Sequence, residues 1–252
     1  MRSIKQIRDL LSEMPDSKLI SELQTDERKG VKQLLKTYNA KLEKKRKDEE
    51  QYRSMQVYEQ DAVSKGYRYI AGTDEAGRGP LAGPVVAAAV ILPDQFFLAG
   101  LNDSKKLSAA KREAFFDIIM GSADVGVGII SAEEIDRINI LNASKKAMLK
   151  AISRLDQQPD YVLADAVTLD MQISQESIIK GDAKSVSIAA ASVIAKVTRD
   201  RLMQEAARKY PGYGFDKNAG YGTKEHVDAI SRSGITSEHR RSFEPVKSMI
   251  RQ

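Results

Sequence analysis

The chain has 252 residues, with 40 Lys and Arg against 35 Asp and Glu and a net charge of +5. Cysteine is absent and only His226 and His239 supply imidazole, which excludes a disulfide framework and a thiolate zinc site. A metal site must therefore consist mainly of carboxylates, which favours Mg²⁺ or Mn²⁺ over Zn²⁺. No apolar run approaches the ~20 residues that span a bilayer, so we expect a cytoplasmic protein without a membrane partner.

Residues 1–66 are predicted to form a helical extension. Residues 1–70 contain 16 Lys and Arg against 12 Asp and Glu, so most of the basic excess lies there. The dense mixed-charge run over 41–53 is typical of a solvated helix face, although its 44–47 stretch leaves open an accessory contact with nucleic acid or protein. Two or three amphipathic helices are expected, because apolar residues recur at helical spacing: Ile4, Ile7, Leu10, Leu11, Val31, Leu34 and Leu35.

From residue 67 to residue 252 the pattern predicts one α/β domain. Ser108 can cap a helix that ends at Met120, and the capping-box pattern of Ser131 with Glu134 predicts the start of the next helix. Further helices are expected over 143–155 and 187–209. Apolar runs predict strands over 67–73, 84–92, 125–129, 161–164 and 177–180. Three strands followed by alternating helices and strands predict a mixed sheet with helices on its faces.

Acidic residues stand where three of the predicted strands end: Asp74 with Glu75, then Asp165, then Asp182. In α/β sheets, strand ends border the crevice in which ligands bind. If these four carboxylates converge, their repulsion requires cations, and two divalent ions ~4 Å apart would also suit a phosphodiester displacement. Spacing alone leaves open that Asp165 and Asp182 are turn or cap residues.

The segment Gly77-Arg78-Gly79 follows the acidic pair directly. Glycine on both sides of Arg78 lets the backbone approach a ligand closely. A dinucleotide fingerprint would need a helix directly after these glycines, whereas Pro80 and a strand-like run follow. The acidic pair and the glycine loop together favour a metal site beside a substrate-reading loop.

Taken together, these motifs resemble bacterial ribonuclease HII. The resemblance covers roughly residues 68–246 and implies a ribonuclease H-like fold. That fold is a mixed five-stranded sheet flanked by helices, here with an α-helical N-terminal extension and a helical C-terminal segment. The related ribonuclease HIII has Lys where Arg78 stands, which favours HII and keeps HIII as the near neighbour. The matching segments are 72–85, 103–107, 165–166, 181–182, 185–199, 220–223 and 239–243.

The resemblance implies a metal-dependent endoribonuclease. It would cleave the RNA strand of RNA–DNA hybrids and nick duplex DNA on the 5′ side of a single embedded ribonucleotide, leaving 3′-OH and 5′-phosphate ends. Asp74, Glu75, Asp165 and Asp182 would be the catalytic carboxylates that hold Mg²⁺ or Mn²⁺, two ions with substrate bound. We expect the enzyme to be a monomer.

The resemblance also implies the substrate contacts. Gly77, Arg78 and Gly79 would meet the ribose 2′-OH mostly through the backbone. Tyr221 would pack against the sugar at the RNA–DNA junction, whereas the sequence alone favours an aromatic plug in a loop.

A phosphate contact is a further possibility at Ser104, Lys105 and Lys106, near a helix start. A solvent-facing lysine pair is the alternative, and Arg240 and Arg241 share this ambiguity. Both histidines are expected to be hydrogen-bonded structural or surface residues rather than ligands.

Two other functions stay open at this point. A DNA-directed nuclease on the same fold, such as a resolvase, would need no sensor for the 2′-OH. A nucleic-acid-binding module would use its acids only structurally and would tolerate their replacement.

Overall fold

A computed structural model describes residues 2–13 and 15–250. The chain forms two compact units that meet between Gln51 and Tyr52. The domain boundary that the sequence predicts, between residues 66 and 67, stays a prediction. The helix α4 (Val57–Ser64) belongs to the second compact unit, where its Ala62 is buried with Leu163 and Ile188.

The first unit contains the helices α1 (Ile4–Ser12) and α2 (Ser17–Gln24) and most of α3 (Lys29–Ser54). Ser3 and Gln6 form a capping box at the start of α1, so its first amides are satisfied. The buried apolar side chains come from all three helices: Ile7, Leu23, Val31 and Leu35. The helical spacing predicts Ile7, Val31 and Leu35, and Leu23 adds to them. The expected helical extension is therefore confirmed.

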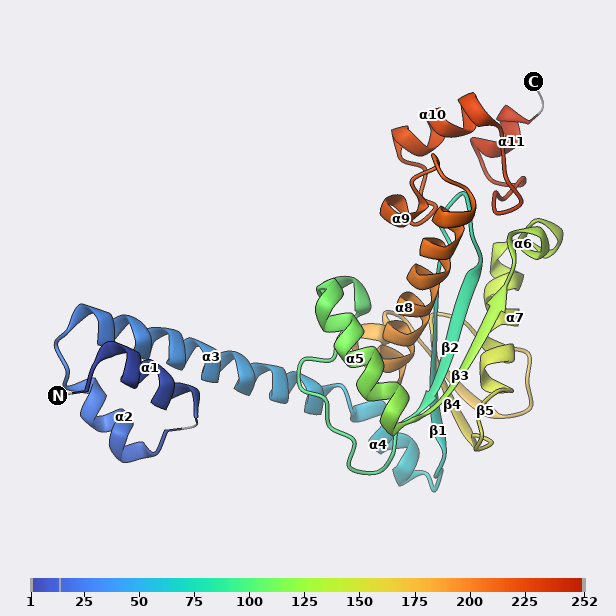
Figure 1. Ribbon diagram of the computed structural model, residues 1–252. Helices are drawn as coiled ribbons and strands as arrows, with labels where there is room; N and C mark the ends of the chain where they lie inside the picture. The colour runs from blue at the N-terminus through green and yellow to red at the C-terminus, as the bar shows by residue number, and fades with distance from the viewer. Residues whose placement is uncertain (1, 14, 251–252) are drawn as a thin grey trace. The chain divides into compact units, whose positions relative to one another are not determined.

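The second unit is built on a five-stranded mixed sheet with the order β3-β2-β1-β4-β5 (Figure 1). β1 (Ile70–Ala76), β2 (Val85–Ile91) and β3 (Asp124–Ile130) form an antiparallel meander. β4 (Tyr161–Asp165) and β5 (Ser174–Ile178) continue it in parallel with β1. The predicted mixed sheet of five strands is confirmed.

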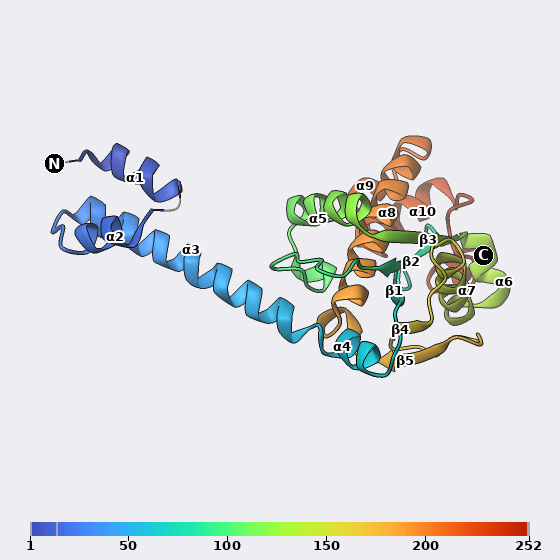
Figure 2. The same cartoon turned by 90° about the horizontal axis from the view of Figure 1, so that it is seen from below.

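Helices cover both faces of this sheet (Figures 1 and 2). α5 (Ala109–Ser122) and α8 (Val186–Lys209) pack on one face, and α6 (Ala132–Ile138) and α7 (Ile140–Ile152) pack on the other. α8 lies so close to β1 that a Cβ on Gly72 would fall 2.2 Å from the backbone of Ser187. The small residues of α8, among them Ala189 and Ala191, permit this approach.

The edge strand β5 differs from its expected position over 177–180. The apolar pair Ile178-Ile179 suggested the later start, but only Ile178 is buried and Ile179 is 71% exposed. Lys180 has a left-handed backbone with φ of 59°, which ends the strand. Residues 174–177 are all polar, so no apolar run marks this part of the edge strand.

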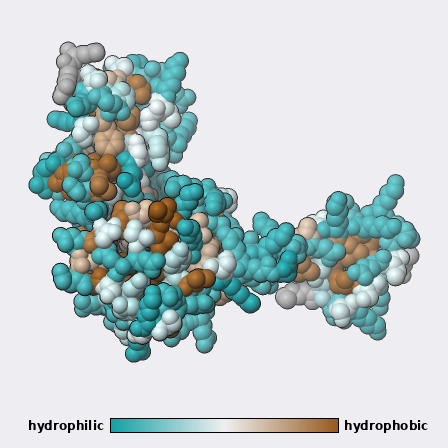
Figure 3. Space-filling model, turned by 180° about the vertical axis from the view of Figure 1, so that it is seen from behind, coloured by the Kyte–Doolittle hydropathy of each residue, from teal (hydrophilic) through white to brown (hydrophobic). Residues whose placement is uncertain are grey.

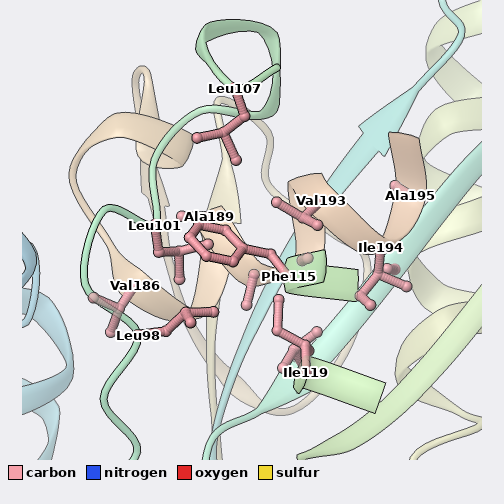
Figure 4. Packing of buried hydrophobic residues seen from close by; sticks show 14 of the residues in the cluster. Leu98, Leu101, Leu107, Phe115, Ile119, Val186, Ala189, Val193, Ile194 and Ala195 are labelled. Carbon is pink, nitrogen blue, oxygen red and sulfur yellow. The ribbon is translucent and has the colours of Figure 1, made fainter. Parts of the chain in front are cut away.

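Loop residues 98–107 are held against α5 and α8 by apolar packing. Leu101 and Leu107 contribute to the cluster that contains Phe115 of α5 and Val193 of α8 (Figure 4). Between these two leucines lies the short 3₁₀ helix η1 (Ser104–Lys106). The packing therefore fixes the position of η1 against α8.

The C-terminal segment is helical, as predicted, with α9 (Phe215–Asn218), α10 (Lys224–Ser233) and α11 (Val246–Met249). Its core joins Phe215, Ile230 and Val246 to Leu81 and Met203. Hydrophilic residues dominate the surface seen in Figure 3. Within the described residues, no helix is both long and apolar enough to cross a membrane.

Candidate active site

Strand pairing places two carboxylates side by side. β1 and β4 run parallel with Thr73 opposite Ala164, so the next residues, Asp74 and Asp165, stand at the same edge of the sheet. Asp74 is buried, and its Oδ1 accepts the N–H of Glu75 at 2.7 Å. The crevice at the strand ends therefore begins with two adjacent acids.

A turn brings Asp182 to the same place. Oδ1 of Asp165 accepts the N–H of Gly181 at 2.7 Å, which holds the short helix η2 (Gly181–Ala183) against the end of β4. One carboxylate oxygen from each of Asp74, Asp165 and Asp182 lies within 4.8 Å of the others. The structure brings these three acids together, while their catalytic role stays a prediction.

Burial and mutual repulsion disfavour the ionised forms of Asp74 and Asp182. Burial raises the pKa of Asp74 well above its usual value, and the charges of Glu75 and Asp165 raise it further. Burial also raises the pKa of Asp182, with Asp103 and Asp165 adding to the effect. A divalent cation would relieve this repulsion, and a set of hard oxygen donors suits Mg²⁺ or Mn²⁺. The donor set thus fits the expected metals.

Glu75 lies beside this cluster of three rather than within it. Its Oε1 accepts a hydrogen bond from Nη1 of Arg78 at 3.2 Å. Its Oε2 is buried and has no hydrogen-bond partner among the residues that the structure describes. Burial raises the pKa of Glu75 even though Arg78 opposes the shift. An unpartnered buried carboxylate oxygen is the kind of group that a bound ion would satisfy.

Three of the acids, Asp74, Glu75 and Asp165, open onto a cavity of about 400 Å³ whose walls also include Gly77, Arg78, Gly79 and Tyr221. Gly77 has φ of +98°, which favours glycine, and a Cβ there would fall 2.1 Å from Nε of Arg199. Tyr221 is 49% exposed, and its ring lies 3.6 Å from where a Cβ on Gly79 would stand. The predicted 2′-OH loop and the aromatic residue thus share one cavity with Asp74, Glu75 and Asp165.

Of the three predicted phosphate contacts, Ser104 and Lys105 line this cavity. Ser104 is buried and its hydroxyl is hydrogen-bonded to that of Ser192 at 2.9 Å. Lys105 lines the cavity; burial would lower its pKa, but the carboxylates of Asp103 and Asp74, with others, raise it. Lys106 is exposed and does not line the cavity. Phosphate binding stays a prediction, and Lys105 is the residue best placed for it.

Sequence reasoning missed several polar residues of α8. Ser192, Lys196 and Arg199 all line the cavity. Their spacing of four and three residues places them on one helical face. A polar stripe on an otherwise buried helix could have revealed them.

The two histidines form a buried, neutral chain of hydrogen bonds, which confirms their expected structural role. The Thr236 N–H donates to Nδ1 of His239 at 2.9 Å. The two Nε2 atoms are 3.1 Å apart, and Nδ1 of His226 lies 2.8 Å from the Tyr221 carbonyl oxygen. Because that oxygen only accepts, His226 carries its proton on Nδ1 and His239 donates from Nε2.

The sequence left open whether Arg240 contacts a phosphate or faces solvent, and in the structure it does not face solvent. It is fully buried and donates to the carbonyl oxygens of Gly77, Arg78 and Gly83. Burial, with the neighbouring Arg199, lowers its pKa to about 9. The basic pair Arg240-Arg241 therefore contains one residue that supports the glycine loop from inside.

Comparisons with known proteins agree with this geometry. The family model described as Ribonuclease HII matches residues 71–246, and the model described as Ribonuclease HII N-terminal domain matches residues 3–63. The extension that fell outside the resemblance thus has a family match of its own.

Curated relatives extend over nearly the whole chain. Ribonuclease HII of Geobacillus sp. is 51% identical, covering 98% of this chain and 91% of the relative, and that of Bacillus cereus is 54% identical, covering 98% and 95%. The crystal structure of ribonuclease H2 from Pyrococcus horikoshii OT3 is 27% identical with a TM-score of 0.62, covering 72% of this chain and 97% of that one. The chain therefore belongs to the ribonuclease HII family and is an endoribonuclease with ribonuclease H activity on RNA–DNA hybrids.

Proposed function

We propose that this enzyme, besides cleaving RNA–DNA hybrids, nicks duplex DNA on the 5′ side of a single embedded ribonucleotide and leaves 3′-OH and 5′-phosphate ends. The observation that carries the proposal is the convergence of Asp74, Asp165 and Asp182, with mutual oxygen distances within 4.8 Å, in front of a glycine loop. We propose further that the enzyme acts as a monomer in the cytoplasm.

Asp74, Asp165 and Asp182 would hold Mg²⁺ or Mn²⁺, and Glu75 would complete the set through its unpartnered Oε2. Two ions held there would supply the means to lower the pKa of a water molecule and to stabilise negative charge on an oxygen. Lys105, with its raised pKa, keeps a positive charge beside the acids and is placed to meet a phosphate.

The glycine loop and Tyr221, which line the same cavity, would select the substrate. The backbone of Gly77, Arg78 and Gly79 would read the 2′-OH, the group that distinguishes RNA from DNA. Tyr221 is half-exposed beside Gly79 and would lie against the sugar at the junction. Both contacts depend on backbone and ring geometry rather than on titratable groups.

A cleavage assay tests the proposal. The substrates are a duplex DNA with one ribonucleotide and its all-DNA counterpart, each with Mg²⁺, with Mn²⁺ or with EDTA. We expect one nick on the 5′ side of the ribonucleotide with either metal, and none with EDTA or without the ribonucleotide. Cleavage of the all-DNA duplex would favour the DNA-directed nuclease instead.

A further inference from the structure

Arg240 is a buried cation. Its relative exposure is 0%, and it forms no ion pair with any residue in 2–13 or 15–250. Burying an unpaired charge is strongly unfavourable unless other groups satisfy it. The groups around Arg240 therefore indicate why a guanidinium stands there.

The partners of Arg240 are backbone carbonyls of the glycine-rich segment. Nε and Nη2 donate to the Gly83 oxygen at 3.1 and 2.9 Å. Nη1 donates to the Arg78 oxygen at 2.9 Å, and Nη2 donates to the Gly77 oxygen at 2.6 Å. The ring of Phe243 supports the guanidinium, with its centroid 5.0 Å from Cζ. A planar fork of donors suits several carbonyls at once.

These contacts fix which way two peptide groups face. In a trans peptide, the C=O and the following N–H point in opposite directions, and neither peptide here is cis. Because the Gly77 and Arg78 carbonyls face Arg240, the N–H groups of Arg78 and Gly79 face away from it. Across the described part of the chain, neither N–H donates to a backbone or side-chain acceptor. Both residues line the cavity that contains the acids.

We propose that Arg240 is a positioning residue for ribose selection. It draws two carbonyls inward and so leaves the Arg78 and Gly79 amides as free donors for the oxygen of the substrate's 2′-OH. This inference rests on the proposed function, since it explains how the loop of that same site is held. Donors that are already oriented lose little entropy when the substrate binds.

The variant Arg240→Lys tests the proposal, because lysine keeps the charge but cannot reproduce the planar fork. The readout is the ratio of two affinities: for a duplex with one ribonucleotide and for the same duplex in all-DNA form. Both are measured without divalent ions, so that the duplexes stay intact. We expect the ratio to fall about tenfold, with the affinity for all-DNA duplex kept. An unchanged ratio in a folded Arg240→Lys protein would overturn the proposal.

Arg154 provides a control that lies outside the site. Its Nη1 donates to the carbonyl oxygen of Val127 at 2.6 Å, and neither residue lines the cavity that contains the acids. Arg154→Lys replaces an arginine that holds a backbone carbonyl away from the 2′-OH loop, so the affinity ratio should stay near that of the wild type. An equal fall of the ratio in both variants would count against a specific role of Arg240.

A second measurement needs no variant. In ¹⁵N-labelled wild-type protein, the Arg78 and Gly79 amide resonances should shift with the ribonucleotide duplex more than with the all-DNA duplex. Equal shifts would overturn the proposal even if Arg240→Lys fails to fold. A wild-type protein that neither prefers nor cleaves the ribonucleotide duplex would refute the proposed function itself, so the two failures are distinct.

Discussion

Two groups of ionisable side chains in the second unit, a histidine pair and an acid cluster, differ in how far the protein itself satisfies them. The histidine pair, His226 and His239, has hydrogen-bond partners at both ends. The acid cluster, Asp74, Asp165 and Asp182, contains like charges, and the neighbouring Glu75 keeps one oxygen unpartnered within the described residues. Burial with full hydrogen bonding marks structure, whereas burial of unsatisfied groups marks a place for a ligand.

The largest expected effect comes from removing one acid. Asp74→Asn keeps the size of the side chain but removes a charge shared by the bound ions. We expect turnover on a ribonucleotide duplex to fall about 10³-fold or more, which corresponds to roughly 4 kcal/mol of the barrier. Single-turnover kinetics and duplex binding measure the two effects separately. Cleavage at the wild-type rate would refute the metal scheme and favour a binding module.

A smaller effect is expected at the aromatic wall of the cavity. Tyr221→Ala removes the ring beside Gly79 and should reduce cleavage at a single ribonucleotide about tenfold, since contacts of this kind contribute ~1–3 kcal/mol. Nonspecific duplex binding should fall less. Tyr221→Phe is the matched control because it keeps the ring. Equal losses in cleavage and in nonspecific binding after Tyr221→Ala would contradict the junction role.

The histidine pair predicts a loss of stability rather than of chemistry. His239→Leu leaves the Thr236 N–H and Nε2 of His226 without their partners, which costs about 1–3 kcal/mol. For a chain of this size, that amounts to roughly 2–4 °C of melting temperature per kcal/mol. Thermal unfolding with and without Mg²⁺ should show the same decrease. An unchanged melting temperature would mean that the pair does not stabilise the fold.

For the acid cluster, we expect substitution to stabilise the metal-free protein rather than to destabilise it. Asp74→Asn should raise the melting temperature of the metal-free protein at pH 7 by a few degrees, because it relieves buried repulsion. Addition of Mg²⁺ should stabilise the wild type more than the variant and reduce the difference. If the metal-free wild type were more stable than the variant at pH 7, this would contradict the claim that repulsion among the acids destabilises the metal-free protein.

The two groups also respond to pH with opposite signs. The pKa of Asp74 is higher in the folded state than in the unfolded state. Its contribution to folding stability is therefore fully present at pH values below the unfolded-state pKa, and it is lost as the pH rises through the folded-state pKa. Burial lowers the pKa of His239 to about 4, so its effect is present above pH ~6.5 and is lost as pH falls toward 4. When the melting temperature is measured from pH 4 to 8, His239→Leu should weaken its dependence on pH at the acidic end. Asp74→Asn should weaken that dependence at the neutral end.

The sequence predicted the sheet and the acids that follow its strands because both leave local patterns. Apolar runs mark β1 and β4, and an acid directly after each run places Asp74 and Asp165 correctly. The sequence predicts Asp182 at the end of a strand, whereas it lies in η2, four residues beyond Ile178, the last residue of β5. Arg240 and the histidine pair left no usable pattern, because their partners come from distant segments of the chain.

Anomalous diffraction from crystals grown with Mn²⁺ tests the metal site most directly. We predict at least one Mn²⁺ peak about 2.0–2.2 Å from carboxylate oxygens of Asp74 and Asp165, with Asp182 or Glu75 completing the ligands. The same crystals of Asp74→Asn should lose that peak. A wild-type crystal with Mn²⁺ bound elsewhere and none between these acids, from protein that cleaves under the same conditions, would contradict a carboxylate-held catalytic metal.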